Sequence, residues 1–341
     1  MLDRFIISAL AIATLTGPVA AAGRGAVQAA CFPGQSLVAR PGEETPVKLG
    51  RPQAIRMPRA ETGAAMNIPR GAIRRVELPP GRKLIALTLD LCEQWSEVAG
   101  YDGAIVDYLR ANKVKATFFG GGKWMATHGE RTQQLMSDDL FEVGTHGWAH
   151  RNVRGLTGGN LVAEITAPSA AYTQLRGALA ATQCAAGQPA AMQSIPAQPG
   201  LYRFPFGACN AEALDAVANA GLLAIQWDIS TGDPAPNQSA RAIANEMIQH
   251  ARPGSIIIAH ANGRGFHTAA GLPMAIPALR AKGFEFVTVS ELLAAGKPVV
   301  VDTCYDAQPG DTDKYDSFFA PRARMTTPGG GAQQARPGAR N

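Results

Sequence analysis

Short apolar runs alternate with helical patterns along most of this chain. Seven short, mostly apolar runs of three to six residues predict buried strands, at 84–89, 116–119, 141–143, 202–204, 222–227, 255–259 and 284–287. The intervening segments space their apolar residues as one face of a helix. They predict helices over 101–112, 131–137, 160–179, 211–220, 239–250 and 274–282, and a loop over 183–200. We expect Ser239 to cap one helix and Ser290 to cap a last short one.

This alternation predicts parallel β/α units, which build either an open α/β sheet or a barrel. In both architectures, ligands bind at the carboxyl ends of the strands. Polar residues of unusual type follow several of the predicted strands. The strand ends are therefore the place to look for a functional site.

The two ends of the chain differ in composition from the middle. Residues 1–22 predict a signal peptide, because a twelve-residue apolar run is followed by small residues and is too short to span a membrane. An uncleaved N-terminal anchor is the alternative. Residues 23–80 are rich in Pro and Arg and predict an extended arm, and residues 305–341 predict a disordered Gly/Pro/Arg-rich tail. The folded domain is expected over residues 81–300.

Charge follows the same division. The net charge of the chain is +5, but residues 84–320 carry a net charge of −6 and the flanks are basic. A mildly acidic core makes nucleic acid an unexpected partner. We expect an exported protein, periplasmic or extracellular, that is a monomer and has no transmembrane segment once the signal peptide is removed.

Five cysteines remain after signal cleavage, which is an odd number in a compartment that permits disulfides. Pairs Cys31–Cys304 and Cys184–Cys209 are our provisional assignment, with Cys92 left over. Cys31 also raises the alternative of a lipid anchor, although the residues before it match that signal poorly.

Five polar motifs stand at or just after predicted strands. Asp90 ends the first strand, and His146 and His150 lie four residues apart after the third. Two histidines at this spacing on a helical turn face the same way and are able to hold one metal. Arg203 needs a carboxylate partner if it is buried, and Asp90 is the candidate. The fourth motif ends in Asp233, and His260 closes an apolar strand, where it is well placed as an acid or base.

Taken in order, these motifs resemble those of the polysaccharide deacetylase family of the NodB-homology type. They read Thr-Leu-Asp-Leu-Cys (88–92), His-Gly-Trp-Ala-His (146–150), Arg-Phe-Pro-Phe-Gly (203–207), Ser-Thr-Gly-Asp-Pro (230–234) and Ile-Ala-His (258–260). The likeness covers residues 84–295. It implies a distorted (β/α) barrel of about seven parallel strands and a metal-dependent hydrolase of amide C–N bonds.

The resemblance also implies a role for each motif. A divalent metal on His146 and His150 would lower the pKa of bound water toward about 7 and polarise the acetamide carbonyl. Asp90 matches the family's base, and Arg203 would hold it ionised. His260 matches the acid that protonates the leaving amine, and Asp233 would orient it. Zinc is the expected metal, with cobalt, nickel or iron as alternatives.

The chain departs from the family pattern at the carboxylate that ligates the metal, because Leu91 stands there. Glu93 is our hypothesis for the replacement ligand, and Cys92 is the alternative. Trp148 and Phe206 offer apolar faces to a sugar, unless they serve only in packing. Pro234 and Ser230 also depart from the pattern and indicate a different substrate groove.

The sequence thus predicts an exported enzyme that removes N-acetyl groups from an envelope or extracellular polysaccharide. Two alternatives remain open. One is a catalytically impaired relative that binds glycan without cleaving it, which the loss of a ligand at Leu91 motivates. The other is a metallohydrolase of a small, non-peptide amide.

Overall fold

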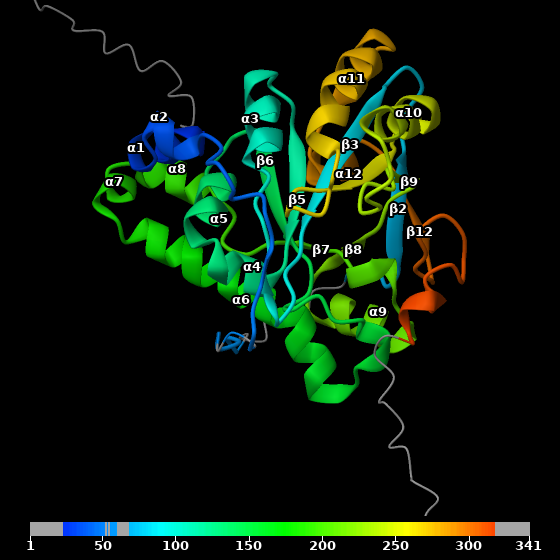
Figure 1. Ribbon diagram of the computed structural model, residues 1–341, viewed down its shortest axis with the longest axis horizontal. Coiled ribbons are helices and arrows are strands. Elements are labelled where there is room, and N and C mark those ends of the chain that lie inside the picture. Colours follow the sequence, from blue (N-terminus) through cyan, green and yellow to red (C-terminus); the bar gives the residue numbers. More distant parts are fainter. Residues whose placement is uncertain (1–22, 52, 54, 60–67, 318–341) are drawn as a thin grey trace, which may run out of the picture.

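A curled, mostly parallel sheet with helices around it forms the body of the protein (Figure 1). The structure, a computed structural model, describes residues 23–51, 53, 55–59 and 68–317. The predicted signal peptide and residues 318–341 of the predicted tail lie outside the described residues.

The strands are β1 (Val47–Lys48), β2 (Ala72–Glu77), β3 (Leu84–Leu91), β4 (Glu97–Val98), β5 (Ala116–Gly120), β6 (Phe141–Thr145), β7 (Leu201–Tyr202), β8 (Leu223–Ile225), β9 (Ile229–Ser230), β10 (Ile256–His260), β11 (Glu285–Phe286) and β12 (Lys297–Val301). The main sheet has the order β12-β2-β8-β7-β6-β5-β3-β10-β9, and β11 pairs with β3. Every neighbouring pair along it is parallel except β12–β2. The distorted (β/α) barrel expected from the sequence is therefore confirmed.

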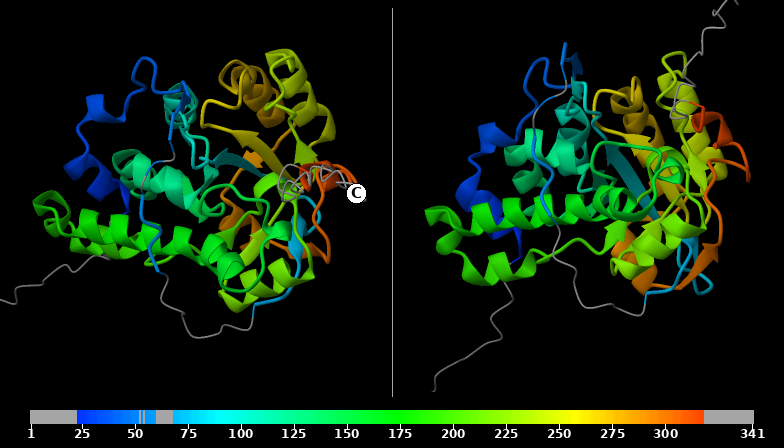
Figure 2. Two further views of the ribbon diagram at one scale, coloured as in Figure 1. Left: turned by 60° about the horizontal axis from the view of Figure 1, so that its bottom comes forward. Right: turned by 90° about the horizontal axis from the view of Figure 1, so that it is seen from below.

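The α-helices are α1 (Gly25–Cys31), α2 (Gly34–Leu37), α3 (Gly103–Ala111), α4 (Gly122–Thr127), α5 (Gly129–Met136), α6 (Gly158–Ala180), α7 (Gln183–Ala186), α8 (Pro189–Ser194), α9 (Ala211–Asn219), α10 (Ala240–His250), α11 (Thr268–Ala281) and α12 (Val289–Ala294). Short 3₁₀ turns lie at η1 (Val153–Gly155), η2 (Pro205–Gly207) and η3 (Asp313–Tyr315). The long helix α6 runs across one side of the fold and contacts α4, α5 and α9 (Figure 2).

The central strand β3 is buried on both faces. Its side chains point alternately to the two faces of the sheet, so alternate residues pack in two different apolar clusters. Ile85, Leu87, Leu89 and Leu91 join the apolar cluster between the sheet and helices such as α3 and α11. Leu84 and Ala86 join a second cluster, lined by apolar residues of β5, β8 and β10. Even-numbered residues of β3 therefore face the interior of the curled sheet.

Two segments that were expected to be irregular are ordered elements. Within the predicted arm, α1 is a helix and β2 is a buried strand of the main sheet. Strand β2 is not predicted from the sequence because two adjacent arginines, Arg74 and Arg75, interrupt its apolar pattern. The buried Arg74 guanidinium donates hydrogen bonds to the carbonyl oxygens of Tyr305 and Asp306 and stacks on the Tyr305 ring. The loop expected over 183–200 contains the helices α7 and α8.

Two expectations about helix ends also need correction. Helix α11 begins at Thr268, six residues before the predicted start at 274, and Pro273 and Pro277 inside it obscure its pattern. The last helix is capped by Thr288, not by Ser290. Thr288 and Glu291 form a capping box there. Ser239 caps α10 as predicted, accepting a hydrogen bond from the backbone of Ala242.

The disulfides join Cys31 to Cys184 and Cys209 to Cys304, so both provisional pairings are wrong. Helix α1 packs against α7, which is what brings Cys31 to Cys184. Such a pairing depends on tertiary contacts that sequence spacing does not encode. Cys92 is free and buried, as expected for the odd cysteine.

The part of the predicted tail that the structure describes, residues 305–317, is bound to the barrel. Asp306 accepts a hydrogen bond from the Trp227 indole, and Arg154 pairs with Asp313 and Asp316. The disulfide at Cys304 anchors the start of this segment. The prediction of disorder is therefore wrong for residues 305–317.

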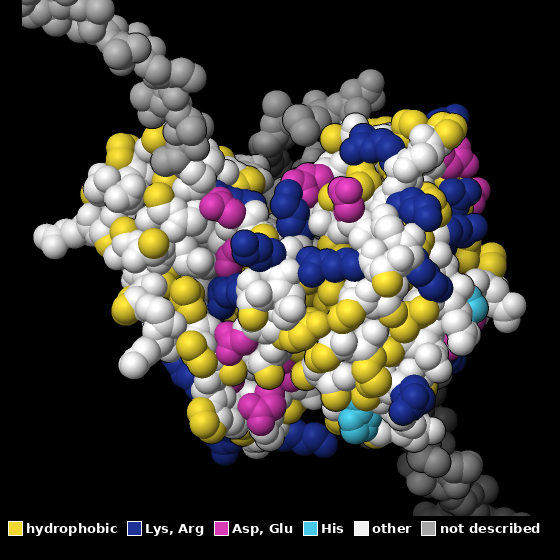
Figure 3. Space-filling view, turned by 90° about the horizontal axis from the view of Figure 1, so that it is seen from above, with side chains coloured by type: hydrophobic (Ala, Val, Ile, Leu, Met, Phe, Trp, Pro, Cys, Tyr) yellow, Lys and Arg dark blue, Asp and Glu magenta, His cyan; other side chains and the backbone are white. Residues whose placement is uncertain are grey.

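None of the helices that the structure describes is long and apolar enough to cross a membrane. On the face shown in Figure 3, Lys and Arg side chains are interspersed with Asp and Glu side chains. They do not form one continuous basic patch on that face.

Candidate active site

The predicted functional residues converge where parallel strands end. Asp90 lies near the end of β3, and His260 is the last residue of β10, paired in register with it. His146 follows β6 directly, and Arg203 follows β7. Because these strands are parallel, their carboxyl ends meet at one end of the sheet. Four residues distant in sequence thus share one small volume.

Asp90 and Arg203 form a fully buried ion pair. An oxygen of Asp90 accepts a hydrogen bond from Nη1 of Arg203 at 2.8 Å, and the two side chains are 2% and 0% exposed. The guanidinium also donates to Thr88 Oγ1 and to the carbonyl oxygens of Ile225 and Gln226. Its plane lies over the Phe119 ring at 4.1 Å. The sequence prediction that Asp90 partners a buried arginine is met in this geometry.

This environment keeps Asp90 ionised. Burial alone would raise the pKa of its carboxyl group, but the charge of Arg203 above all, the neighbouring His146 and His260, and the hydrogen bond from Arg203 hold that pKa below its ordinary value. A carboxylate in this state is able to accept a proton. Its second oxygen lies 3.4 Å from Nε2 of His146.

His146 is oriented through its other ring nitrogen. Its Nδ1 lies 3.0 Å from the carbonyl oxygen of Arg203, so Nδ1 carries the proton and donates it there. The lone pair of Nε2 is then directed into the site, which is the arrangement of a metal-ligating histidine. Burial lowers the pKa of His146, and a neutral imidazole is the form that ligates metal.

His150 stands on a strained loop that is held by helix α6. Its φ is +53°, and its ring is 5.0 Å from that of His146. Glu164, buried on α6, accepts hydrogen bonds from the backbone N–H groups of Ala149 and Arg151 on either side of it. Gly147 also has positive φ, and an added Cβ there would lie 3.0 Å from Pro205 and 3.1 Å from Glu164. Burial and the neighbouring His146 lower the pKa of His150 well below its ordinary value.

His260 and Asp233 form the second acid–base pair. Nδ1 of His260 lies 2.9 Å from one oxygen of Asp233, and the other oxygen accepts from the His260 backbone N–H and from Thr268 Oγ1. Burial would lower the pKa of His260, but Asp233, with its charge and hydrogen bond, and the more distant Asp90 raise it above the ordinary value. His260 is therefore favoured in its protonated form and is able to donate from Nε2.

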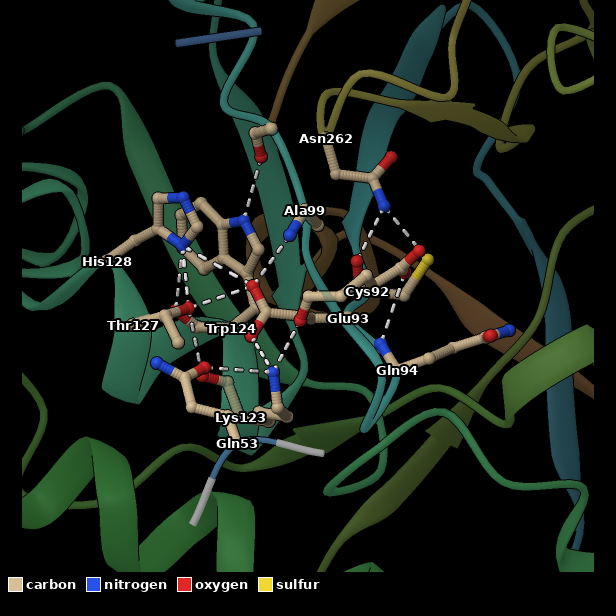
Figure 4. A network of polar contacts seen from close by, with 12 residues as sticks. Gln53, Cys92, Glu93, Gln94, Ala99, Lys123, Trp124, Thr127, His128 and Asn262 are labelled. Carbon is tan, nitrogen blue, oxygen red and sulfur yellow. Dashed lines mark hydrogen bonds and ion pairs between the residues drawn. The ribbon is translucent and has the colours of Figure 1, made fainter. Parts of the chain in front are cut away.

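The structure places Glu93 away from the two histidines. Its carboxylate pairs with the buried ammonium of Lys123 and accepts hydrogen bonds from Ala99 N at 2.8 Å and Thr127 Oγ1 at 2.9 Å (Figure 4). The hypothesis that Glu93 ligates the metal disagrees with this arrangement. Beyond the end of β3 the alternation continues, so Glu93 points to the same side as Leu91, toward α4. Burial raises the pKa of Glu93, against the opposing effect of Lys123.

Cys92, not Glu93, joins the histidines. Its sulfur and a ring nitrogen of each of His146 and His150 all lie within 4.8 Å of one another. Burial, with the nearby charge of Asp90, raises the pKa of Cys92 to about 12. The thiol therefore keeps its proton unless a cation displaces it.

The two aromatic residues expected to bind sugar differ in their exposure to solvent. Trp148 is 1% exposed and packs with Ala149, Ala167 and Ala171, so it serves in packing and the expectation of a sugar platform is wrong for it. Phe206 is half-buried. Its ring lies 4.3 Å from that of His150 and 5.1 Å from that of Tyr315.

Sequence reasoning missed the residues that hold the reactive groups. Glu164, Thr88, Thr268 and Asn262 were not singled out, because each lies in an ordinary helix, strand or loop pattern. Glu164 alone had a recognisable signal, because it is the single acidic residue of the predicted helix over 160–179 and lies among the apolar residues of that helix. Asn262 Nδ2 donates to the carbonyl oxygen and the sulfur of Cys92, at 2.7 and 3.0 Å.

The protein is a barrel of mostly parallel strands. Two pairs of acid–base residues lie at the carboxyl ends of these strands, as in the active site of a hydrolase. Residues 77–225 match the model of a family described as polysaccharide deacetylase. The match includes Asp90, both histidines and Arg203. Over these residues, the chain is similar to the polysaccharide deacetylase family.

Individual relatives support this assignment. The chain is 26% identical over 255 residues to the peptidoglycan-N-acetylglucosamine deacetylase PgdA of Listeria monocytogenes, covering 72% of this chain and 48% of that protein. It is 26% identical over 220 residues to a peptidoglycan-N-acetylglucosamine deacetylase of Bacillus cereus, covering 64% and 91%. The chain spans about half the length of the first curated relatives it matches.

Solved structures share the fold. A peptidoglycan N-acetylglucosamine deacetylase superposes with a TM-score of 0.55 at 21% identity, covering 66% of this chain and 94% of that one. A CE4 family pseudoenzyme from Bacillus anthracis superposes with a TM-score of 0.53 at 20% identity, covering 69% and 72%. At these identities the likeness establishes the architecture alone.

The contacts of Glu164 generate a prediction. Glu164→Ala leaves two backbone N–H groups beside His150 without their acceptor, which we expect to lower the free energy of unfolding by about 1–3 kcal/mol. We also expect zinc affinity to fall by about 10–100-fold, the range found when a group that supports a metal ligand is lost.

Glu164→Gln is the matched control, because its amide oxygen still accepts a hydrogen bond. Urea unfolding and zinc titration check both variants. Zinc affinity of Glu164→Ala equal to that of the parent would show that Glu164 does not position His150.

Proposed function

We propose that this protein hydrolyses N-acetyl groups of an envelope or extracellular polysaccharide, releasing acetate and a free amine. The proposal rests mainly on two ion pairs, Asp90–Arg203 and His260–Asp233. Both lie beside His146 and His150 at the carboxyl ends of the strands. A protein that only bound glycan would have no use for two groups with opposite proton affinities. The names of the relatives, deacetylases of peptidoglycan and of chitooligosaccharide, support the substrate class.

Asp90 would act as the general base. It is ionised through its bond to Arg203, and its free oxygen is turned toward His146. From there it would take the proton of the attacking water. Arg203 would fix its position and keep its pKa low, without contacting the substrate itself.

His260 would act as the general acid. Asp233 fixes Nδ1 of the imidazole, so the proton on Nε2 is the one available to the leaving amine. Protonation of the nitrogen is required, because an amine is expelled far more readily than its anion. Phe206, beside His150, would give the sugar ring an apolar wall.

His146 and His150 fit a divalent metal, since His146 is buried and His150 half-buried, both have lowered pKa values, and Nδ1 of His146 is hydrogen-bonded to a carbonyl oxygen. When bound there, the metal would supply a Lewis acid that activates water and polarises the acetamide carbonyl. Zinc is the expected ion, and cobalt, nickel or iron also suit imidazole ligands.

The cellular setting follows from the substrate. Polysaccharides of the envelope lie outside the cytoplasm, and the two disulfides are stable in an oxidising compartment. We therefore propose export to the periplasm or the extracellular space, with the signal peptide over residues 1–22. A monomer suffices for this chemistry, because one chain supplies every residue named.

One observation favours a second candidate function, a glycan-binding relative without activity. Leu91 occupies the place of the family's carboxylate ligand and is buried in the outer core. A structural neighbour is itself a pseudoenzyme. The two candidates differ in whether acetate is released.

We expect the purified chain to bind about one zinc ion and to release acetate from an N-acetylglucosamine oligomer. Chelation should abolish the release, and added zinc or cobalt should restore it. Metal analysis with an acetate assay on the same samples is the measurement. Absence of acetate after metal addition, from chitin and peptidoglycan oligomers alike, would favour the binding-only candidate.

His260 must be protonated, so activity should fall as pH rises through its pKa, which Asp233 raises. In Asp233→Asn that support is lost and burial dominates, so the falling limb of kcat should move to lower pH. At neutral pH we expect a loss of about 10²–10⁴-fold.

Asp302→Asn, an exposed site with the same change of charge, is the control and should keep the parent profile. The measurement is the pH profile of acetate release. An unmoved alkaline limb in Asp233→Asn would exclude His260 as the acid that this limb reports.

A further inference from the structure

Strand alternation decides which residue of the first motif reaches the histidines. Leu91 lies with Ile85, Leu87 and Leu89 in the cluster between sheet and helices, 1% exposed. Asp90 faces the opposite side, toward Arg203. Successive residues of an extended chain point to opposite faces, so Cys92 returns to the side of Asp90. Leu91 therefore lies on the side away from the histidines, whereas Cys92 lies with them.

The sulfur of Cys92 completes a compact set of three donor atoms. It lies within 4.8 Å of ring nitrogens of both His146 and His150, a spacing that one ion is able to bridge. Catalytic zinc sites in proteins use three protein ligands and leave a fourth position open, and a cysteine with histidine is an established ligand combination. Cys92 is also the only free thiol among the described cysteines.

Asn262 provides an independent observation. Its side-chain N–H donates to the sulfur at 3.0 Å and to the Cys92 carbonyl oxygen at 2.7 Å, which fixes the sulfur in place. Figure 4 shows this amide directed at Cys92, while the carboxylate of Glu93 is directed away from it, toward Lys123. A sulfur that accepts a hydrogen bond suits a thiolate ligand, because such outer contacts orient metal ligands and tune them.

We propose that Cys92 is the third protein ligand, so that this protein binds its metal through one thiolate and two imidazoles. This inference rests on the proposed function, and it replaces the carboxylate that Leu91 lacks. On binding, the sulfur–metal bond forms as the S–H bond breaks, and the proton leaves to solvent. A thiolate favours soft and borderline ions, so zinc and cobalt should be preferred over magnesium or manganese.

The direct test is zinc-edge X-ray absorption on the zinc-loaded full chain. We expect one sulfur scatterer at about 2.3 Å beside nitrogen or oxygen scatterers at about 2.0–2.1 Å. The cobalt-loaded chain should show an intense near-ultraviolet sulfur-to-cobalt charge-transfer band. Neither readout depends on turnover.

Variants sharpen the test. Cys92→Ser should lose the band and lower zinc affinity at least about 100-fold. Cys92→Asp should regain zinc affinity without the band, because a carboxylate then stands where the sulfur was. His250→Ala, an exposed histidine on α10, is the control and should keep both metal content and band. Circular dichroism confirms that each variant is folded.

Full zinc occupancy with only nitrogen and oxygen scatterers would overturn the inference. So would a cobalt band that survives in Cys92→Ser. Acetate release is measured on the same samples. Acetate release with a sulfur-free metal shell overturns the role of Cys92 and leaves the deacetylase proposal standing, whereas a chain that binds no metal and releases no acetate overturns both.

Discussion

The buried ion pair between Arg203 and Asp90 is the interaction on which this site depends. Breaking a buried pair by removal of one partner typically costs about 3–5 kcal/mol, because an uncompensated charge remains. Here the Arg203 guanidinium also donates to Thr88 and to the carbonyl oxygens of Ile225 and Gln226 at the end of β8, and the Arg203 carbonyl oxygen accepts a hydrogen bond from Nδ1 of His146. One residue thus links the ends of β3, β7 and β8 with the first histidine. The same residue thus positions the base through its side chain and the candidate metal ligand through its backbone.

Around this pair, residues of β3 alternate between the outer apolar core and the site inside the curled sheet. Residues facing outward, ending in Leu91, fill the core between sheet and helices. Residues facing inward end in Asp90 and, one further step along, Cys92. Glu93 falls on the outward side and neutralises the buried Lys123. A leucine at position 91 is therefore compatible with a working site, provided that position 92 supplies a ligand.

The architecture and the main acid–base residues are predictable from the sequence, because apolar runs and ordered motifs are local signals. The barrel, the Asp90–Arg203 pair and the His260–Asp233 pair all appear as expected. The disulfide partners and strand β2 were not predictable, since both depend on which segments lie side by side. Glu93 was mistaken for a ligand because distance along the chain is no guide to the direction of a side chain. The buried Lys123 opposite it gave no pattern in the sequence.

We propose that Asp90, held by Arg203, is the base of a deacetylase. Acetate release by zinc-loaded Asp90→Asn, compared with the parent chain, tests it most directly. Asparagine keeps the size of the side chain and loses the capacity to take a proton. We expect kcat to fall by about 10²–10⁴-fold with zinc still bound. A variant that releases acetate at the parent rate would contradict it.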